Sequence, residues 1–181
     1  MLFGRSWRRQ RVRIKQPRRE PPAMKIIWNL GEKRGMFMHD NRMHLEFLSL
    51  SQNESFARSV AGAFLTQLNP TVEELTDVRT AVSEAVTNAI IHGYGGNLGM
   101  VTLECEISGD TCTLRVQDQG VGIPDVEQAR QPFYTSHPEL ERSGMGFTLM
   151  ETFMDEVSVT SRMGEGTTVT MKKTIKRQGL Q

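Results

Sequence analysis

The most informative stretch of the chain is SEAVTNAIIHG, residues 83–93, in which a glutamate and an asparagine stand among small and apolar residues. Glu84 and Asn88 are four residues apart, so on a helix they lie on one face, one turn from each other. Burying a carboxylate beside an amide is unfavourable unless both are paired, so the two are poor core residues. They are well suited to face a solvated metal ion and a reacting hydroxyl group.

The helix that carries this pair is predicted to begin after Thr71, because Thr71 and Glu74 have the spacing of a capping box. It is expected to run to about residue 92, and Gly93 is expected to end it. Ahead of it, the apolar pattern predicts a strand over 43–51 and a helix over 51–68.

Further along the chain, the pattern predicts two strands, a short helix, an irregular stretch, a longer helix and two closing strands. These segments are expected over 100–108, 111–118, 125–130, 146–157, 157–161 and 167–174. The order β-α-α-β-β-α-α-β-β favours helices gathered on one face of a mixed, mainly antiparallel sheet. The predicted fold class is therefore an α/β (α+β) two-layer sandwich, formed by one domain.

Charge is divided unevenly along the chain. Residues 1–37 hold eleven Lys and Arg against two Asp and Glu, a net charge of +9, whereas the remainder holds eleven against nineteen, a net charge of −8. The basic segment lacks a sustained apolar period, so we expect it to be disordered. It is a basic arm for nucleic acid or membrane, an extension created by a start assigned too early, or a tail of undefined role.

The second interpretation places the start of translation near Met38, since residues 33–35 can be encoded by purine-only codons that would form a ribosome-binding site. We therefore expect a domain over 38–175 and a tail over 176–181. No apolar run approaches the ~20 residues of a transmembrane helix, and no signal peptide is recognisable. Cys105 and Cys112 are expected in one hairpin as free thiols, which indicates the cytoplasm.

Three glycine-rich stretches follow the helix of residues 83–93. In Asp118-Gln119-Gly120-Val121-Gly122, at a strand end, an aspartate can accept a hydrogen bond from an amine and the glycines let a ligand approach the backbone. SGMGF, residues 143–147, leads into a helix whose free N-terminal amides suit phosphate. GEGTT, residues 164–168, is a third such turn. Each is a weak signal alone, and the absence of GxxxxGK[ST] excludes P-loop chemistry.

In this order, Glu-x-x-x-Asn, DxGxG, GMGF and GTT resemble the ATPase and kinase superfamily of gyrase, Hsp90, histidine kinases and MutL. The stretches MHLEFLSLSQNESFAR, SEAVTNAIIHGY, EQARQPFYTSHPELERSGMGF and MGEGTT are more specific, and they are similar to the anti-sigma F factors of sporulating bacteria. The resemblance covers about residues 38–175 and nothing in 1–37.

The resemblance implies a Bergerat-type ATP-binding fold and a protein serine kinase that uses ATP and Mg²⁺. It implies Glu84 as the general base, Asn88 as the Mg²⁺ ligand and Asp118 as the acceptor for the adenine amine. Further nucleotide-binding residues implied by it are Gly120, Gly122, Arg142, Gly144, Gly146 and Thr168, with Arg142 near the γ-phosphate and Thr168 near adenine. His92 is expected to be structural or close to the nucleotide.

The resemblance also implies partners. Members of this family hold a sporulation sigma factor of the sigma F type inactive while ATP or ADP is bound, phosphorylate a serine of an anti-anti-sigma protein, and act as homodimers. Arg58 occupies the position that contacts both partners, and Glu54, one turn earlier, is a weaker candidate. Direct contact with nucleic acid or with a membrane is not expected.

Several alternatives remain at this point. A nucleotide-gated binding module without kinase activity would not need Glu84, and an ATPase of the gyrase and MutL type would need a transducer domain. A nucleic-acid-binding protein would rest on the +9 segment alone. A switch kinase for another sigma factor is the closest competitor in chemistry.

Overall fold

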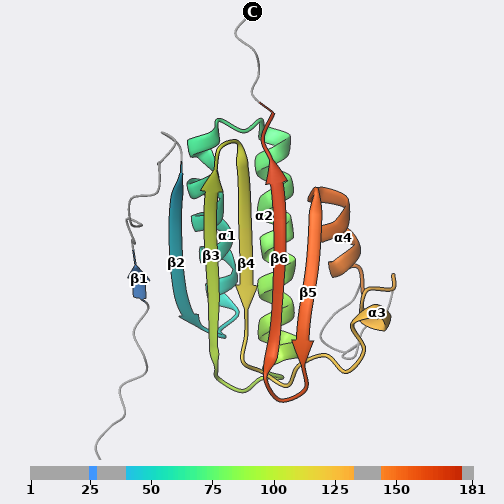
Figure 1. The fold of residues 1–181 in the computed structure, drawn as a ribbon. Coiled ribbons are helices and arrows are strands. Elements are labelled where there is room, and N and C mark those ends of the chain that lie inside the picture. Colours follow the sequence, from blue (N-terminus) through green and yellow to red (C-terminus); the bar gives the residue numbers. More distant parts are fainter. Residues whose placement is uncertain (1–24, 28–39, 133–143, 177–181) are drawn as a thin grey trace, which may run out of the picture.

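The computed structural model describes residues 25–27, 40–132 and 144–176, and in it one sheet is covered on one face by helices (Figure 1). The strands run in the order β1-β2-β3-β4-β6-β5, and all five pairings between the described strands are antiparallel. The strands are β1 (Lys25–Ile27), β2 (Asn41–Leu48), β3 (Met100–Ser108), β4 (Thr111–Gln117), β5 (Glu156–Arg162) and β6 (Gly166–Thr174).

The long helices α1 and α2 lie behind the sheet in this view, and α4 lies beside β5. The helices are α1 (Gln52–Leu65), α2 (Val72–Asn88), α3 (Val126–Ala129) and α4 (Gly146–Phe153), with a 3₁₀ turn η1 (Thr66–Leu68) and a π turn η2 (Ala89–Gly93). This architecture confirms the two-layer prediction. No described helix is long and apolar enough to cross a lipid bilayer.

Alternation of side chains along the strands produces the core. Alternate residues of β2, β3 and β4 are buried against the helices, because successive strand side chains point to opposite faces. Among them are Leu45, Leu103 and Leu114, each with no exposed surface. Cys105 and Cys112 belong to this set and are free thiols, as the sequence predicted.

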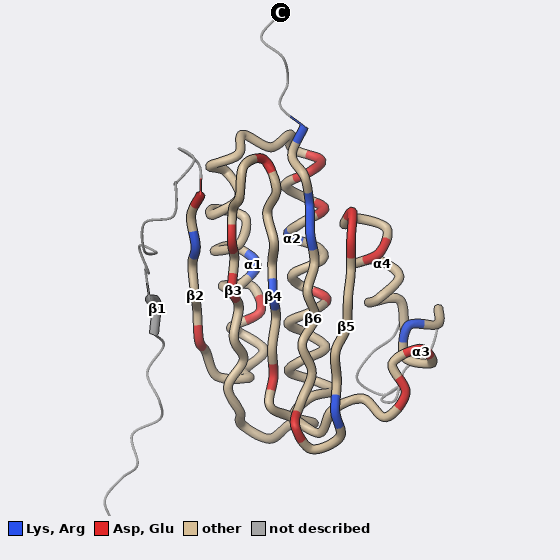
Figure 2. The backbone as a smooth tube through the Cα atoms, in the orientation of Figure 1, with Lys and Arg blue, Asp and Glu red and all other residues tan. Residues whose placement is uncertain are grey.

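Charged residues of both signs stand along the strands of the sheet (Figure 2). Arg42 pairs with Glu106 at 3.2 Å, and Arg115 pairs with Glu104 at the same distance across neighbouring strands. Acidic and basic side chains of neighbouring strands therefore pair across the sheet.

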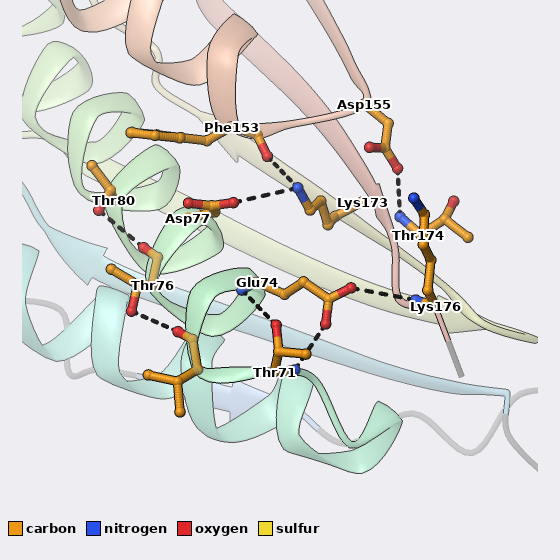
Figure 3. A network of polar contacts seen from close by, with 11 residues as sticks. Thr71, Glu74, Thr76, Asp77, Thr80, Phe153, Asp155, Lys173, Thr174 and Lys176 are labelled. Atoms are coloured by element: carbon orange, nitrogen blue, oxygen red, sulfur yellow. Dashed lines mark hydrogen bonds and ion pairs between the residues drawn. The ribbon is translucent and has the colours of Figure 1, made fainter. Parts of the chain in front are cut away.

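The start of α2 is fixed by the predicted capping box (Figure 3). The Glu74 amide donates to the Thr71 hydroxyl at 3.1 Å, and the Thr71 amide donates to Glu74 Oε2 at 2.8 Å. The other carboxylate oxygen of Glu74 accepts from the Lys176 amide at 3.3 Å, so the cap also holds the chain that follows β6.

A lysine joins α2 to the end of α4 in the same region (Figure 3). Lys173 Nζ donates to the Phe153 carbonyl at 2.7 Å and lies 3.5 Å from Asp77 Oδ2. A cation at a helix C-terminus satisfies an orphan carbonyl and complements the helix dipole. The two helices are therefore held together at the end remote from residues 84 and 88.

Local differences from the sequence prediction have identifiable causes. Ser51 precedes α1 without forming a side-chain cap, while the side-chain amide of Asn53 donates from Nδ2 to the Leu48 carbonyl at 2.8 Å. The helix expected over 146–157 ends at Phe153, because Met154 is extended and the chain enters β5. The three residues of β1 lie in the segment expected to be disordered and pair with β2; the rest of 1–37 lies outside the described residues.

Candidate functional site

A cavity of about 280 Å³ opens at the end of the sheet where β4 and β6 meet the C-terminal half of α2. Its wall combines α2 and η2, the loop after β4, the start of α4, and residues of β6. It is lined by Ala85, Asn88, Ala89, His92, Gly93, Val116, Asp118, Val121, Gly122, Ile123, Pro124, Asp125, Ala129, Gly144, Gly146, Phe147, Met163, Thr167 and Val169. Apolar residues dominate, with few polar groups among them, as in typical small-molecule sites.

Asp118 supplies the buried carboxylate of this wall. Only 4% of the residue is exposed, and its amide donates to the Thr167 carbonyl at 2.9 Å. Burial raises the pKa of the Asp118 carboxyl group, and hydrogen bonds that involve Gly120 and Thr167 partly offset this. A carboxylate that lines a cavity can accept a hydrogen bond from an amine on a ligand.

Two positions of the DxGxG loop require glycine, because other segments of the backbone pass too close for a side chain. A Cβ at Gly120 would collide with the carbonyl of Gly93, and one at Gly122, where φ is +77°, would collide with the carbonyl of Arg162. Gly122 lines the cavity, whereas Gly120 is not among the lining residues. The loop is therefore packed between η2 and the β5–β6 turn, with Asp118 at its base.

Glu84 and Asn88 meet the N-terminus of α4. A Cβ on Gly146 would lie 3.2 Å from Glu84 Oε2 and 3.3 Å from Asn88 Nδ2, so both side chains reach the first turn of α4. Asn88 and Gly144 line the cavity, and Glu84 stands beside it, half-buried. A carboxylate, an amide and a helix N-terminus thus converge, the grouping that phosphate chemistry needs.

The helix changes its winding at this point. α2 ends at Asn88 and continues as the π turn η2 up to Gly93, where the sequence predicted an unbroken α-helix. A π turn widens the helix by one residue per turn. Such turns are common at functional sites, because they change the direction of the side chains and of the chain that follows. Here the turn brings Gly93 against the Asp118 carboxylate: a Cβ on Gly93 would lie 2.9 Å from Asp118 Oδ1.

The threonine that lines the cavity is Thr167, whereas the sequence pointed to Thr168. Side chains alternate along β6, and Thr167 shares the parity of the core residues Val169 and Met171, so Thr168 points to the other face of the sheet. The Thr167 hydroxyl lies 2.9 Å from the Ser161 hydroxyl, which in turn accepts from the Ile123 amide at 2.7 Å.

The described residues contain no cluster of three His, Cys, Asp or Glu side chains that could hold a metal ion. The donor set at the α2–α4 junction still suits Mg²⁺, because this ion keeps several waters and takes most other ligands from phosphates. The Asn88 amide oxygen would be its protein ligand here. Arg142, predicted near the γ-phosphate, lies outside the described residues.

Arg58 and Glu54 lie on α1 and do not line the cavity. Arg58 Nε is 3.4 Å from Glu54 Oε1, and the same carboxylate oxygen accepts from the Ser83 hydroxyl at 2.6 Å. Arg58 Nε is buried and makes no hydrogen bond among the described residues. Ser83 immediately precedes Glu84 on α2. The contacts of Arg58 and Glu54 therefore reach the residue next to Glu84.

Sequence reasoning missed Tyr94 and Ser161. Tyr94 follows Gly93 in a glycine-rich turn. A single aromatic residue in such a turn indicates that its ring packs against the neighbouring chain. The Tyr94 hydroxyl accepts a hydrogen bond from the Gln119 amide. Ser161 has no signal in the sequence, because its neighbour Thr167 is placed by the pairing of β5 with β6 and its partner Ile123 lies in the loop after β4. His92, expected to be structural or near a nucleotide, lines the cavity.

Comparison with known proteins agrees with this geometry. Residues 49–173 match the family described as the histidine kinase-like ATPase domain. A protein named anti-sigma F factor from Clostridium novyi (strain NT) is 61% identical over 140 residues, which are 77% of this chain and 98% of the relative. Those of Clostridium kluyveri and Geobacillus kaustophilus are 60% and 59% identical over 136 residues, covering 96% and 93% of their lengths.

The matched family spans the elements that form the cavity, from α1 to β6, and the relatives align over nearly their whole length. An ATPase-like domain implies that the protein binds a nucleotide. This chain therefore belongs to the anti-sigma F factor family, built on a histidine kinase-like ATPase domain.

Proposed function

We propose that the protein is an ATP-dependent serine kinase that also binds and inhibits a sigma factor of the sigma F type during sporulation. The observation that carries the kinase proposal is the convergence of Glu84 and Asn88 with the start of α4, beside a cavity that holds the buried carboxylate of Asp118. The names of the relatives support the sigma factor as one partner.

In this proposal the adenine end of ATP occupies the part of the cavity near Asp118. The Asp118 carboxylate accepts a hydrogen bond from the exocyclic amine, and the nearby Thr167 hydroxyl provides a second polar group. The apolar wall, including Val116 and Phe147, covers the faces of the base. The phosphates lie toward the amides of Gly144 and Gly146 at the start of α4.

The reaction transfers the γ-phosphoryl group from ATP to a serine hydroxyl of an anti-anti-sigma protein. The serine oxygen forms a bond to phosphorus, the bond from phosphorus to the β,γ-bridging oxygen breaks, and ADP leaves. Glu84 accepts the serine proton. The Asn88 amide oxygen would hold Mg²⁺, which would supply positive charge to the phosphate oxygens.

A first experiment tests the base. Glu84→Gln removes the proton acceptor while keeping shape and hydrogen-bonding capacity, so phosphate transfer to the partner serine should fall at least 100-fold. ATP binding should change less than threefold. The matched control is Glu73→Gln, on the exposed part of the same helix, which should transfer at the wild-type rate.

Other outcomes identify the alternatives. If wild-type protein binds ATP but transfers no phosphate, the protein is a nucleotide-gated binding module. If it releases inorganic phosphate without a protein acceptor, and does so through Glu84, it is an ATPase. Transfer that survives Glu84→Gln would contradict the role of Glu84 as base.

The sigma factor is proposed to bind the surface of α1 around Arg58 and Glu54 on a homodimer. The Arg58 side chain is 39% exposed, and its ion-pair partner Glu54 lies on the same helix. Part of the Arg58 side chain is therefore accessible to an acidic partner. Sigma factors act with RNA polymerase, which sets the proposed location as the cytoplasm. Neither DNA nor a membrane is a proposed ligand.

Arg58→Ala should weaken sigma F binding at least tenfold in the presence of ATP or ADP, because it removes a charged contact from the interface. ATP affinity should remain within twofold of wild type, since Arg58 does not line the cavity. Arg115→Ala, which removes an exposed arginine of β4 that pairs with Glu104, is the matched control and should leave both affinities unchanged. Equal losses in the two variants would contradict the proposed surface.

A further inference from the structure

Tyr94 makes two hydrogen bonds that join separate parts of the chain. Its hydroxyl accepts from the Gln119 amide at 2.9 Å and donates to the Met100 carbonyl at 2.5 Å. Its ring fills the space over Gly99, where a Cβ would collide with it. The turn after η2, the start of β3 and the loop after β4 therefore meet at one hydroxyl group.

The backbone around Asp118 is held at four successive amides. Those of residues 118, 119, 120 and 121 donate to the Thr167 carbonyl, the Tyr94 hydroxyl, Asp118 Oδ1 and the Gly93 carbonyl, respectively. Of these acceptors, only the Tyr94 hydroxyl belongs to the side chain of a residue outside the loop. It is thus the one restraint in this set that a side-chain substitution removes without changing the loop itself.

We propose that Tyr94 is a positioning residue for base recognition: by holding the Gln119 amide, it fixes the direction of the Asp118 carboxylate and so the preference for a purine with a 6-amino group. This inference rests on the proposed nucleotide site. Asp118 contacts the base, and Tyr94 acts on it through one peptide unit.

The chemistry of the tyrosine suits this role. Burial raises the pKa of Tyr94, and the nearby Asp118 charge raises it further, while the two backbone hydrogen bonds oppose the shift. The hydroxyl therefore keeps its proton at neutral pH and can donate to Met100 while accepting from Gln119. Loss of the hydroxyl would leave both backbone groups to find water, and the loop would gain freedom to rotate.

The experiment compares two ligands in wild type and in Tyr94→Phe. One is ATP, and the other is the triphosphate of purine riboside, which lacks the 6-amino group. Wild type should bind ATP at least tenfold more tightly. Tyr94→Phe should lose about tenfold in affinity for ATP, while its affinity for the second ligand stays within twofold of wild type.

Ser49→Ala is the matched control. The Ser49 hydroxyl steadies the same turn, donating to the Asn97 carbonyl at 3.1 Å and accepting from the Gly99 amide at 2.9 Å. Within the described part of the chain the Ser49 hydroxyl bonds only residues 97 and 99 and not residues 118–121, so its removal should leave both affinities within twofold. Hydrogen exchange gives a second readout: in Tyr94→Phe the Gln119 amide should exchange faster relative to the Val121 amide.

Equal losses for both ligands in Tyr94→Phe would reduce Tyr94 to a structural residue and overturn the inference. Unchanged ATP affinity would overturn it as well. If wild type binds ATP tightly but does not discriminate between the ligands, base reading by Asp118 fails and this inference fails with it. If wild type binds neither ligand, the proposed nucleotide site itself is wrong.

Discussion

At the scale of single residues, the proposed hydrogen bond from adenine to Asp118 would link pH to nucleotide choice. Its folded pKa is raised by burial, so the carboxyl group takes up a proton at a higher pH than an ordinary aspartate does. As pH falls through that raised pKa, the charged acceptor proposed for the adenine amine becomes a neutral carboxyl group, which accepts hydrogen bonds more weakly. The preference for ATP over purine riboside triphosphate should therefore shrink as pH falls from neutral toward the acid range.

The measurement is the ratio of the two dissociation constants as a function of pH, because titration of the phosphates cancels in that ratio. A ratio independent of pH would contradict the assignment of Asp118.

Burial of Asp118 also affects the free energy of unfolding. A raised carboxyl pKa means that the charged form opposes folding, so Asp118 weakens the folded state above this pKa and the effect disappears as pH falls.

Gly146 provides a steric prediction at the same scale. Gly146→Ala would set a methyl group 3.2 Å from Glu84 Oε2 and 3.3 Å from Asn88 Nδ2, closer than ordinary van der Waals contact. A small displacement of reacting groups is costly, so phosphate transfer should fall about tenfold or more. Gly62→Ala is the control: its methyl group would lie 3.0 Å from the flexible side chain of Arg79 and 3.5 Å from Leu75 Cδ1, an ordinary contact, and stability should be unchanged or up to about 1 kcal/mol higher.

Four residues that the sequence pointed to line the cavity: Asn88, Asp118, Gly122 and Gly146. Each belongs to a short motif, whose residues are neighbours along the chain however the strands pair. Thr167 was not recognised, since the motif gives two adjacent threonines and only the parity of β6 selects between them. The contact of Tyr94 with Gln119 joins residues 25 positions apart and leaves no local pattern.

At the scale of elements, Lys173 tests how α2 and α4 are held together. Lys173→Met keeps the length of the side chain but removes the donor to the Phe153 carbonyl and the partner of Asp77. The free energy of unfolding should fall by about 1–2 kcal/mol, measured by urea denaturation. Lys172→Met, on the exposed face of the same strand, should change it by less than about 0.5 kcal/mol, because the Lys172–Glu156 pair is a surface ion pair.

The capping box of α2 should contribute a comparable amount. Thr71→Ala removes the acceptor for the Glu74 amide and should lower the free energy of unfolding by about 1 kcal/mol at pH 7. Although burial raises the pKa of Glu74, hydrogen bonds from Thr71 and Lys176 and the charge of Lys173 leave it lowered. The stability that Glu74 contributes is therefore present above its unfolded pKa and is lost as pH falls through the folded pKa. An equal Thr71→Ala penalty far below that pKa would contradict this coupling.

Periodicity and capping signals were enough to predict the element types in the described core, from β2 to β6. The π turn η2 was not predictable, because residues 89–93 have ordinary helical composition and the change of winding depends on packing of Gly93 against the DxGxG loop. The early end of α4 has a similar cause: the Asp155 amide donates to the Lys172 carbonyl, a contact between segments distant along the chain.

At the scale of the whole molecule, we propose that residues 38–175 form the folding unit. A chain that begins at Met38 lacks only the three paired residues of β1 among the described elements, so its core is unchanged. It should bind ATP within twofold of the full chain and unfold in one transition with a midpoint within about 3 °C. A mass measurement on the native protein tests the early-start hypothesis separately, and an N-terminus before Met36 would contradict it.

The central pairing of β4 with β6 has a consequence for biosynthesis. Thr111 of β4 pairs with Thr174, so 63 positions separate partners at the middle of the sheet. While the ribosome is still adding α3 to β5, the hairpin of β3 and β4 has emerged with one edge unpaired. Such an edge favours pairing with other chains, and contacts between distant residues form slowly. The nascent protein should therefore be most prone to aggregation, and most dependent on chaperones, until its last strand leaves the exit tunnel.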